Sequence, residues 1–352
     1  MNKLKKILSV LLATIMLFSS FSLTMAYAAD DIIEDEYDHL PQIYVGGLGC
    51  APIYYKDDPE KETLFYPIDF SRVLLNLLNS GDYILGAIKS KNPDLLYEYL
   101  YAWLMDSFGM LSLEGDGVTM KDEVTCDPIE LKYDGDGVYL FDYDSRRDPV
   151  DMAHELDKYI DWVQEDSGSQ KVELVGSSYG TTVVMAYLNE YRNNWDSIDS
   201  VVLCVPSVGG INFFGEVFSG EIDIDATALR NFLKEKIGLN VTPIVLKAMS
   251  KGGVLDKILD CFAEPLLREA VLDAALQFIR DCLATLPAAW TCIKDEHFES
   301  SMINIFGNNY MSADHKFRGL IDKVTYYHNT VMINAETIIK EAQSAGLKMN
   351  II

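Results

Sequence analysis

The stretch VELVGSSYGTT (residues 172–182) joins a run typical of a β-strand to the helix-like run MAYLNEY. Its centre has the pattern G-x-S-x-G, with glycines at Gly176 and Gly180 and a serine at Ser178. When a serine lies on a tight strand-to-helix turn, small residues two places before and after it relieve the crowding of the backbone. The pattern therefore predicts that Ser178, and not Ser177, is an activated nucleophile. The alternative is a serine in an ordinary glycine-flanked turn.

Strand and helix signals alternate on both sides of this turn. Strands are predicted at 42–47, 137–144, 171–175 and 200–205. A helix is predicted to open at Asp148-Pro149, with proline in its first turn, and others at 68–80, 83–110 and 179–193. Strands that alternate with helices of about 12 residues or more indicate an α/β fold, with a parallel sheet and helices on both of its faces.

The pattern changes at about residue 222. Consecutive helices with no strand between them are predicted at 224–236, 242–250, 253–262 and 264–284, which indicates a helical insertion on the α/β scaffold. A helix at 330–345 and a buried strand at 347–352 follow. The predicted division is a signal peptide at 1–28, the first part of the core at 29–206, the insertion at 207–329 and the returning core at 330–352.

The insertion carries apolar side chains that suit a lid over an acyl chain, although they could equally pack on each other and on the sheet. They are Leu266, Leu267, Val271, Leu276, Phe278 and Ile279.

An oxyanion formed at Ser178 needs backbone donors. The N–H of Tyr179 directly follows the serine, and a second donor is expected from the loop after an early strand. Gly46-Gly47-Leu48-Gly49-Cys50 is that loop by position, and the N–H of Leu48 is the predicted donor. A plain glycine-rich turn is the alternative for this segment.

The N-terminus has the features of a secretory signal. Lys3, Lys5 and Lys6 precede an apolar run from 7 to 25, and Ala26-Tyr27-Ala28 offers the small residues that a signal peptidase recognises. Cleavage is expected after Ala28, which makes the protein secreted; a retained membrane anchor is the alternative. The formal charge of −25 disfavours nucleic acid and anionic membranes as partners. Transient contact with a membrane surface through the lid remains open.

The cysteines indicate neither a disulfide framework nor a metal site. Six are scattered along the chain, without the Cys/His spacing of metal ligands. Cys204 is predicted to be a small apolar residue of a buried strand, and Cys282 and Cys292 are candidates for pairing. We predict no metal and no cofactor.

Several segments, in order, resemble the lecithin:cholesterol acyltransferase-like α/β-hydrolases. They are 43–49 (early strand and oxyanion loop), 143–149 (the family's Tyr-Asp-Trp-Arg stretch), 175–180 (the nucleophile turn), 205–220 (entry to the lid) and 286–290 (exit from it). Ser145 replaces the family's tryptophan, and Ser177 and Tyr179 stand where the family has histidine and methionine. The resemblance implies an α/β-hydrolase fold with a helical lid. It also implies an acyl-enzyme at Ser178 that cleaves lipid-like esters or transfers their acyl group to water or an alcohol.

The acid and base of a triad are harder to place. In this fold the order is serine, acid, histidine, and the strand after the lid is 347–352, so both partners are expected beyond Ile352. Among the histidines, His39 and His154 are predicted to be structural. His297, His315 and His328 lie in or after the lid, and His315, beside Asp314, is the best candidate base. The fourth strand ends in ValProSerVal, with no carboxylate before Glu216.

Two other functions stay open at this point. One is a truncated or degenerate hydrolase that binds an acyl or peptidoglycan-associated ligand without catalysis. The other is a thioesterase or cutinase-like esterase that acts on small substrates.

Overall fold

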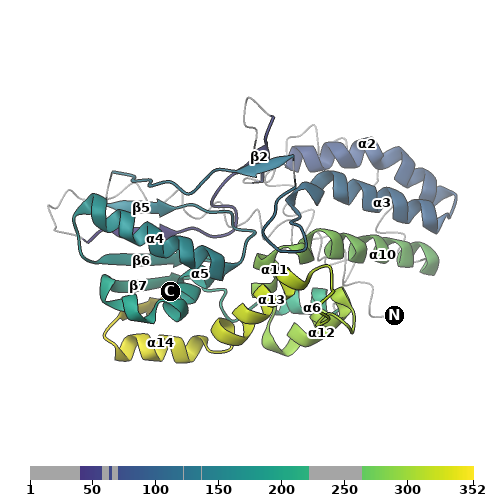
Figure 1. Ribbon diagram of the computed structural model, residues 1–352. Helices are drawn as coiled ribbons and strands as arrows, with labels where there is room; N and C mark the ends of the chain where they lie inside the picture. Colours follow the sequence, from purple (N-terminus) through teal and green to yellow (C-terminus); the bar gives the residue numbers. More distant parts are fainter. Residues whose placement is uncertain (1–39, 58–62, 66–69, 122, 136, 222–263) are drawn as a thin grey trace.

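The computed structural model describes residues 40–57, 63–65, 70–121, 123–135, 137–221 and 264–352 (Figure 1). Its main sheet has five strands in the order β5-β1-β6-β7-β8. They are β1 (Gln42–Val45), β5 (Val138–Phe141), β6 (Val172–Ser177), β7 (Ile198–Cys204) and β8 (Lys348–Ile351). Every pairing between them is parallel. The predicted α/β class with a parallel sheet is therefore confirmed.

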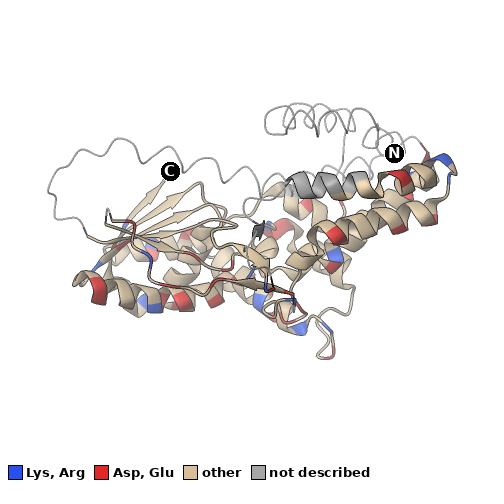
Figure 2. Ribbon diagram, turned by 90° about the horizontal axis from the view of Figure 1, so that it is seen from above, with Lys and Arg blue, Asp and Glu red and all other residues tan. Residues whose placement is uncertain are grey.

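Three helices cover one face of this sheet: α4 (Pro149–Ser167), α5 (Gly180–Glu190) and α14 (Ala335–Ser344) (Figure 2). Asp148 caps α4 by accepting a hydrogen bond from Val150 N–H at 3.2 Å, and Pro149 lies in the first turn as predicted. Burial alternates along β1, β5 and β6, as it does when one face of a sheet is packed more fully than the other. We expected helices on both faces; within the described ranges, these three lie on a single face.

The order of the strands fixes where a site can form. From β1 the chain moves outward to β5, and from β6 it moves the opposite way to β7 and β8. The sheet therefore has a topological switch point between β1 and β6, and ligands of open α/β sheets bind outside the carboxyl ends of the strands at such a point. The glycine loop after β1 and the G-x-S-x-G turn after β6 both lie there.

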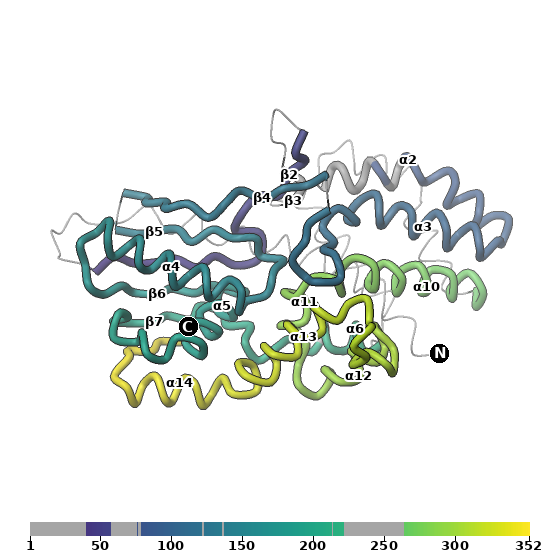
Figure 3. Tube along the Cα trace, viewed as in Figure 1, coloured from purple at the N-terminus to yellow at the C-terminus, as the bar shows by residue number. Residues whose placement is uncertain are grey.

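A layer of helices lies beyond the carboxyl ends of the strands. Figure 3 shows α2 (Phe70–Lys89), α3 (Pro93–Phe108) and α10 (Pro265–Asp281) side by side. The shorter helices next to them are α6 (Asn212–Phe218), α11 (Pro287–Thr291), α12 (Asp295–Phe306) and α13 (Arg318–Tyr327). The helical layer is therefore built from segments that precede β6 in the sequence and segments that follow it. The predicted domain boundaries had assigned residues 68–110 to the core.

The helical expectations are met in part. The helix predicted at 264–284 corresponds to α10, while those predicted within 224–262 lie outside the described residues. Helix α2 continues to Lys89, past the predicted break near residue 81. The break falls instead before Pro93, because proline cannot continue a helix and the Asn92 side chain caps α3.

The apolar face of α10 packs within the helical layer. Leu267, Val271, Phe278 and Ile279 are buried, whereas Leu266 is 66% exposed. Phe278 meets Phe108 of α3 with ring centroids 6.0 Å apart. For these buried residues, packing against neighbouring helices is what the structure shows.

The remaining elements are short. Three antiparallel strands form a small second sheet: β2 (Ile53–Tyr55), β3 (Thr63–Phe65) and β4 (Val124–Cys126). The 3₁₀ turns are η2 (Gly109–Leu111), η3 (Arg192–Ser197) and η5 (Leu283–Thr285), and η6 (His328–Met332) is a π-helix between α13 and α14. None of the helices that the structure describes is long and apolar enough to span a bilayer.

Two expectations about burial were wrong. The strand at 347–352 exists as β8, but it is an edge strand with Ile351 56% exposed, because β7 is its neighbour on one side only within the described sheet. Cys204 ends β7 and is only half-buried.

Cys282 and Cys292, the candidates for a disulfide, are separate buried thiols. The Cys282 Sγ donates to Phe108 O at 3.3 Å.

Candidate active site

Ser178 occupies a strained turn between β6 and α5. Its φ is +51°, in the left-handed region that non-glycine residues seldom adopt. Its N–H donates to Cys204 O at 2.9 Å. Its carbonyl oxygen accepts from the hydroxyls of Thr181 at 2.6 Å and Ser207 at 3.1 Å. These bonds hold the strained backbone, and strain held in this way is common where a side chain must be presented for chemistry.

The two glycines of the turn are required by close packing. A Cβ on Gly180 would lie 2.1 Å from Val45 O, at the end of β1. A Cβ on Gly176 would lie 3.0 Å from Val184 Cγ2 and 3.1 Å from Gly180 O. The helix can therefore start against the strand because neither position has a side chain. This is the close approach that the G-x-S-x-G spacing predicts.

The glycine loop after β1 lies against Ser178. A Cβ on Gly47 would be 3.2 Å from Ser178 Cβ and 3.7 Å from its Oγ. The next residue is Leu48, and Tyr179 follows the serine on the other side. Within the described ranges neither the Leu48 amide nor the Tyr179 amide donates to a protein acceptor. Two backbone amides without a protein acceptor in the described chain thus belong to the residues that follow Gly47 and Ser178, and an oxyanion site would need two such donors.

A buried ion pair beside the loop was not singled out from the sequence. Arg146 Nη2 lies 2.7 Å from Asp144 Oδ2, and Arg146 Nε lies 2.8 Å from Asp144 Oδ1. Both side chains are buried, and the guanidinium also donates to Leu111 O of the helical layer at 3.3 Å. The charged run DSRRD close after a strand was the signal that could have identified it, because charged side chains are seldom fully buried unless they are paired.

A small apolar cavity adjoins this pair and the loop. Its volume is about 20 Å³, the space of about one water molecule. It lies between the sheet edge and the helical layer and is lined by Leu48, Leu111, Ser145, Arg146, Phe214, Leu283, Leu286, Ala288, Ala289 and Cys292. Apart from Ser145 and Arg146, these side chains are apolar or weakly polar. The cavity is therefore suited to a short hydrocarbon group next to Leu48.

The described histidines make their contacts elsewhere. His315 uses both ring nitrogens on backbone groups, Phe306 O and Phe317 N–H, each at 3.2 Å. His154 Nδ1 is 2.8 Å from Tyr191 OH, and His297 lies beside acidic side chains. His328 Nε2 is 2.9 Å from Asp295 Oδ1. In the part of the chain that the structure describes, no histidine is hydrogen-bonded to Ser178 Oγ.

Two buried side chains close to helix α13 have shifted pKa values. Burial raises the pKa of Asp148 to about 7, helped by the nearby carboxylate of Asp151. Burial lowers the pKa of His328, and its hydrogen bond with Asp295 opposes that shift. Asp148 caps helix α4, so the raised pKa of its carboxyl group comes from its structural position in the fold.

His39 lies outside the described residues.

No family model matches the chain, and no curated protein is similar enough to match it. In the described residues, no group of three or more His, Cys, Asp or Glu is arranged to hold a metal ion.

Proposed function

We propose that this protein is a serine esterase, lipase or acyltransferase of the α/β-hydrolase type, with Ser178 as its nucleophile. The observation that carries the proposal is the strained Ser178 turn, with the Gly47 loop packed against it. The serine lies at the switch point of a parallel sheet, and the Leu48 and Tyr179 amides, which have no acceptor within the described residues, follow Gly47 and Ser178 in the chain. A tight turn of this kind is expected to present a nucleophile, and the amides are expected to stabilise an oxyanion.

The reaction would break the ester bond of the substrate, form a new ester bond between the acyl group and Ser178, and then break that second bond. Ser178 Oγ attacks the carbonyl carbon of the substrate, its proton passes to a base, and charge develops on the carbonyl oxygen, which accepts hydrogen bonds from the Leu48 and Tyr179 amides. The alcohol then leaves with a proton, and the acyl group stays on Ser178. Water or an alcohol releases it in the second half of the reaction.

The apolar wall of the cavity supports a proposal for the substrate class. The cavity beside Leu48 is apolar and lies between the sheet edge and the helical layer. It has room for a short hydrocarbon group, so it supports an ester whose acyl group is apolar and whose chain, if longer, would extend beyond the cavity. We propose lipid-like esters as substrates and the helical layer as the lid. We also propose that the protein is secreted, on the strength of the lysines, apolar run and Ala-Tyr-Ala of residues 1–28.

One observation favours a second function. Each histidine of the described chain contacts something other than Ser178 Oγ. A serine without a base keeps only a small part of its catalytic power. The second candidate is therefore a binding protein that holds an acyl ligand at this site without turning it over.

A fluorophosphonate probe separates the two functions. An activated serine displaces fluoride from the phosphorus atom and retains the phosphonyl group, which peptide mass spectrometry locates. We expect labelling at Ser178, none in Ser178→Ala, and full labelling in Ser177→Ala, which changes the neighbouring hydroxyl only. Hydrolysis of p-nitrophenyl esters should follow the same order.

The outcome decides between the candidates. Rapid labelling of the 352-residue chain would also show that a base lies within it. Absence of labelling and turnover, together with saturable binding of a fatty acid, would favour the binding protein. Labelling at a serine other than Ser178 would contradict both assignments of this turn.

A further inference from the structure

The segment after β5 is bonded at three points to the glycine loop that carries Leu48. Tyr143 OH donates to Gly46 O at 2.7 Å, and Cys50 Sγ donates to Tyr143 O at 3.3 Å. Between them, Gly49 N–H donates to Ser145 Oγ at 2.7 Å. The three bonds bracket Leu48, so the direction of its amide depends on this segment.

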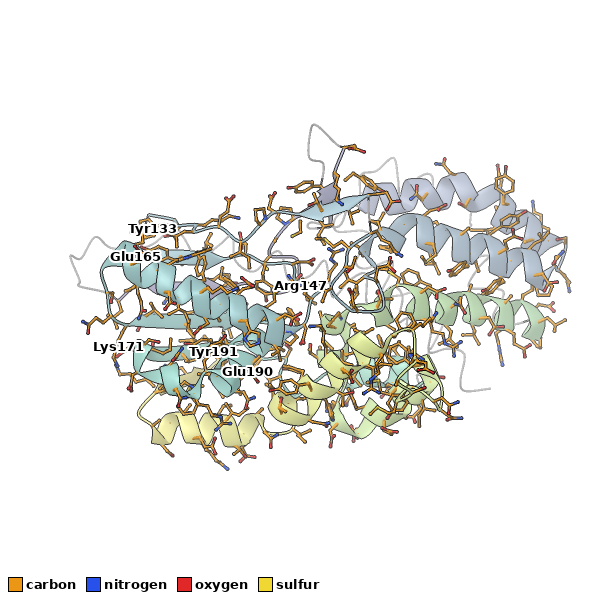
Figure 4. All side chains as sticks on the ribbon, viewed as in Figure 1. Tyr133, Arg147, Glu165, Lys171, Glu190 and Tyr191 are labelled. Atoms are coloured by element: carbon orange, nitrogen blue, oxygen red, sulfur yellow. The ribbon has the colours of Figure 1, made fainter. Side chains whose placement is uncertain are left out.

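The same segment also contacts the side chain of Tyr179, the residue whose backbone amide is the other proposed donor. Tyr179 OH donates to Arg147 O at 2.7 Å, and its ring lies against Tyr143 with centroids 6.3 Å apart. Tyr179 is 1% exposed, so its ring is held on all sides. Figure 4 shows Arg147 at the junction between the sheet and the helical layer. Residues 143–147, which we call the strap, therefore touch both flanks of Ser178.

The strap itself is rigid. Asp144 Oδ1 accepts from the backbone N–H of Arg146 at 3.1 Å as well as from its guanidinium. The pair is buried, and Arg146 reaches across to Leu111 O. Ser145 lies between these two anchored residues and is 2% exposed. Its hydroxyl is thus a fixed acceptor, and loss of it would leave the buried Gly49 N–H without a partner.

We propose that Ser145 is a positioning residue that sets the Leu48 amide for the oxyanion, acting through Gly49. The inference rests on the proposed function of Ser178. Ser145 does not touch the reacting atoms; it holds the loop whose amide does. A donor that is displaced but present should cost less than the 100-fold or more that follows removal of an oxyanion donor. We expect a loss of about tenfold.

The kinetic test uses Ser145→Ala with a conservative partner. On p-nitrophenyl acetate, Ser145→Ala should lower kcat about tenfold with KM unchanged, because the amide matters most when the oxyanion forms. Ser145→Thr keeps the oxygen and should recover most of kcat. The matched control is Ser112→Ala, which removes another buried serine hydroxyl, one that donates to Gly109 O at 2.7 Å. It should leave kcat unchanged.

A second measurement does not need turnover. Hydrogen exchange of the peptide that covers residues 46–50 should accelerate in Ser145→Ala and stay unchanged in Ser112→Ala. Unchanged exchange in Ser145→Ala would overturn the proposal whether or not the protein is active. A loss confined to KM, or an equal loss in Ser112→Ala, would also overturn it. If the wild-type chain shows neither labelling nor turnover, the proposed function is refuted. Even then, faster exchange of residues 46–50 in Ser145→Ala would establish that the contact with Ser145 orders the loop.

Discussion

Gly180→Ala tests the packing on which the candidate site depends. The added methyl carbon would lie 2.1 Å from Val45 O and 2.6 Å from Gly46 O, whereas ordinary contacts begin near 3.4 Å. Both atoms belong to backbone, which cannot rotate away as a side chain can. The start of α5 and the end of β1 must therefore separate by about 1 Å, a small but costly movement in a close-packed interior.

The size of the effect follows from that displacement. Forcing extra atoms into a packed core costs about 1–3 kcal/mol, and contact with backbone favours the upper end. For a chain of this size the melting temperature should fall by about 2–5 °C. A shift of about 1 Å between Ser178 and the Gly47 loop should also slow probe labelling by up to about 100-fold.

The assay is thermal and denaturant unfolding followed by circular dichroism, with probe labelling on the same samples. Gly86→Ala is the matched control, because no atom lies within 4 Å of its added carbon and its backbone has no positive φ. Alanine is the better helix former by roughly 0.5–1 kcal/mol, so this control should gain a little stability. The reasoning about close approach would be refuted if Gly180→Ala melted within about 1 °C of the control.

Three further changes probe the surroundings of the site. Arg146→Met should cost about 3–5 kcal/mol of unfolding free energy, because it leaves the Asp144 carboxylate buried without a partner; adding Asp144→Asn should recover most of it, and no recovery would argue against a true ion pair. Asp148 has its pKa raised by burial to about 7, so the native protein binds this proton up to a higher pH than the unfolded chain, and its unfolding free energy should fall as pH rises from about 4 to 7. Asp148→Asn keeps the helix cap. Its melting temperature should be higher than that of the wild type at pH 8 and equal to it at pH 4; a difference in melting temperature that does not depend on pH would contradict the raised pKa. Leu286→Ala should enlarge the cavity, destabilise the fold by about 2–5 kcal/mol and shift ester preference toward longer acyl chains, whereas an unchanged chain-length profile would mean that the acyl group binds elsewhere.

Short-range signals in the chain were sufficient for most elements. The apolar run that ends in Gly176, the Pro149 that opens α4 and the helical period of α10 each depend on neighbours within a few residues, and each appears in the structure. The parallel α/β class follows from their alternation. The turn at Ser178 belongs to this group, because its glycine spacing is a requirement of local backbone geometry.

Contacts between distant residues decided the rest. Helix α10 follows α3 by more than 150 residues, yet the two pack together, and no periodicity identifies which partner a buried face will choose. The exposure of β8 depends on its place at the edge of the described sheet, which its apolar sequence does not encode. The histidine that looked most suitable, His315, bonds instead to backbone groups near it in the chain.

In the candidate site, too, some features depend on neighbours in the sequence and others on contacts between distant residues. Local sequence places a serine on a strained turn, because backbone sterics act over a few residues. The bond from Gly49 to Ser145 joins residues 96 positions apart, and the pair of Asp144 and Arg146 is tied to the helical layer through Leu111. Such contacts form only once the sheet brings the carboxyl ends of β1, β5 and β6 together. The nucleophile candidate could therefore be found in the sequence, whereas the strap that would orient its oxyanion donors could be found only in the folded chain.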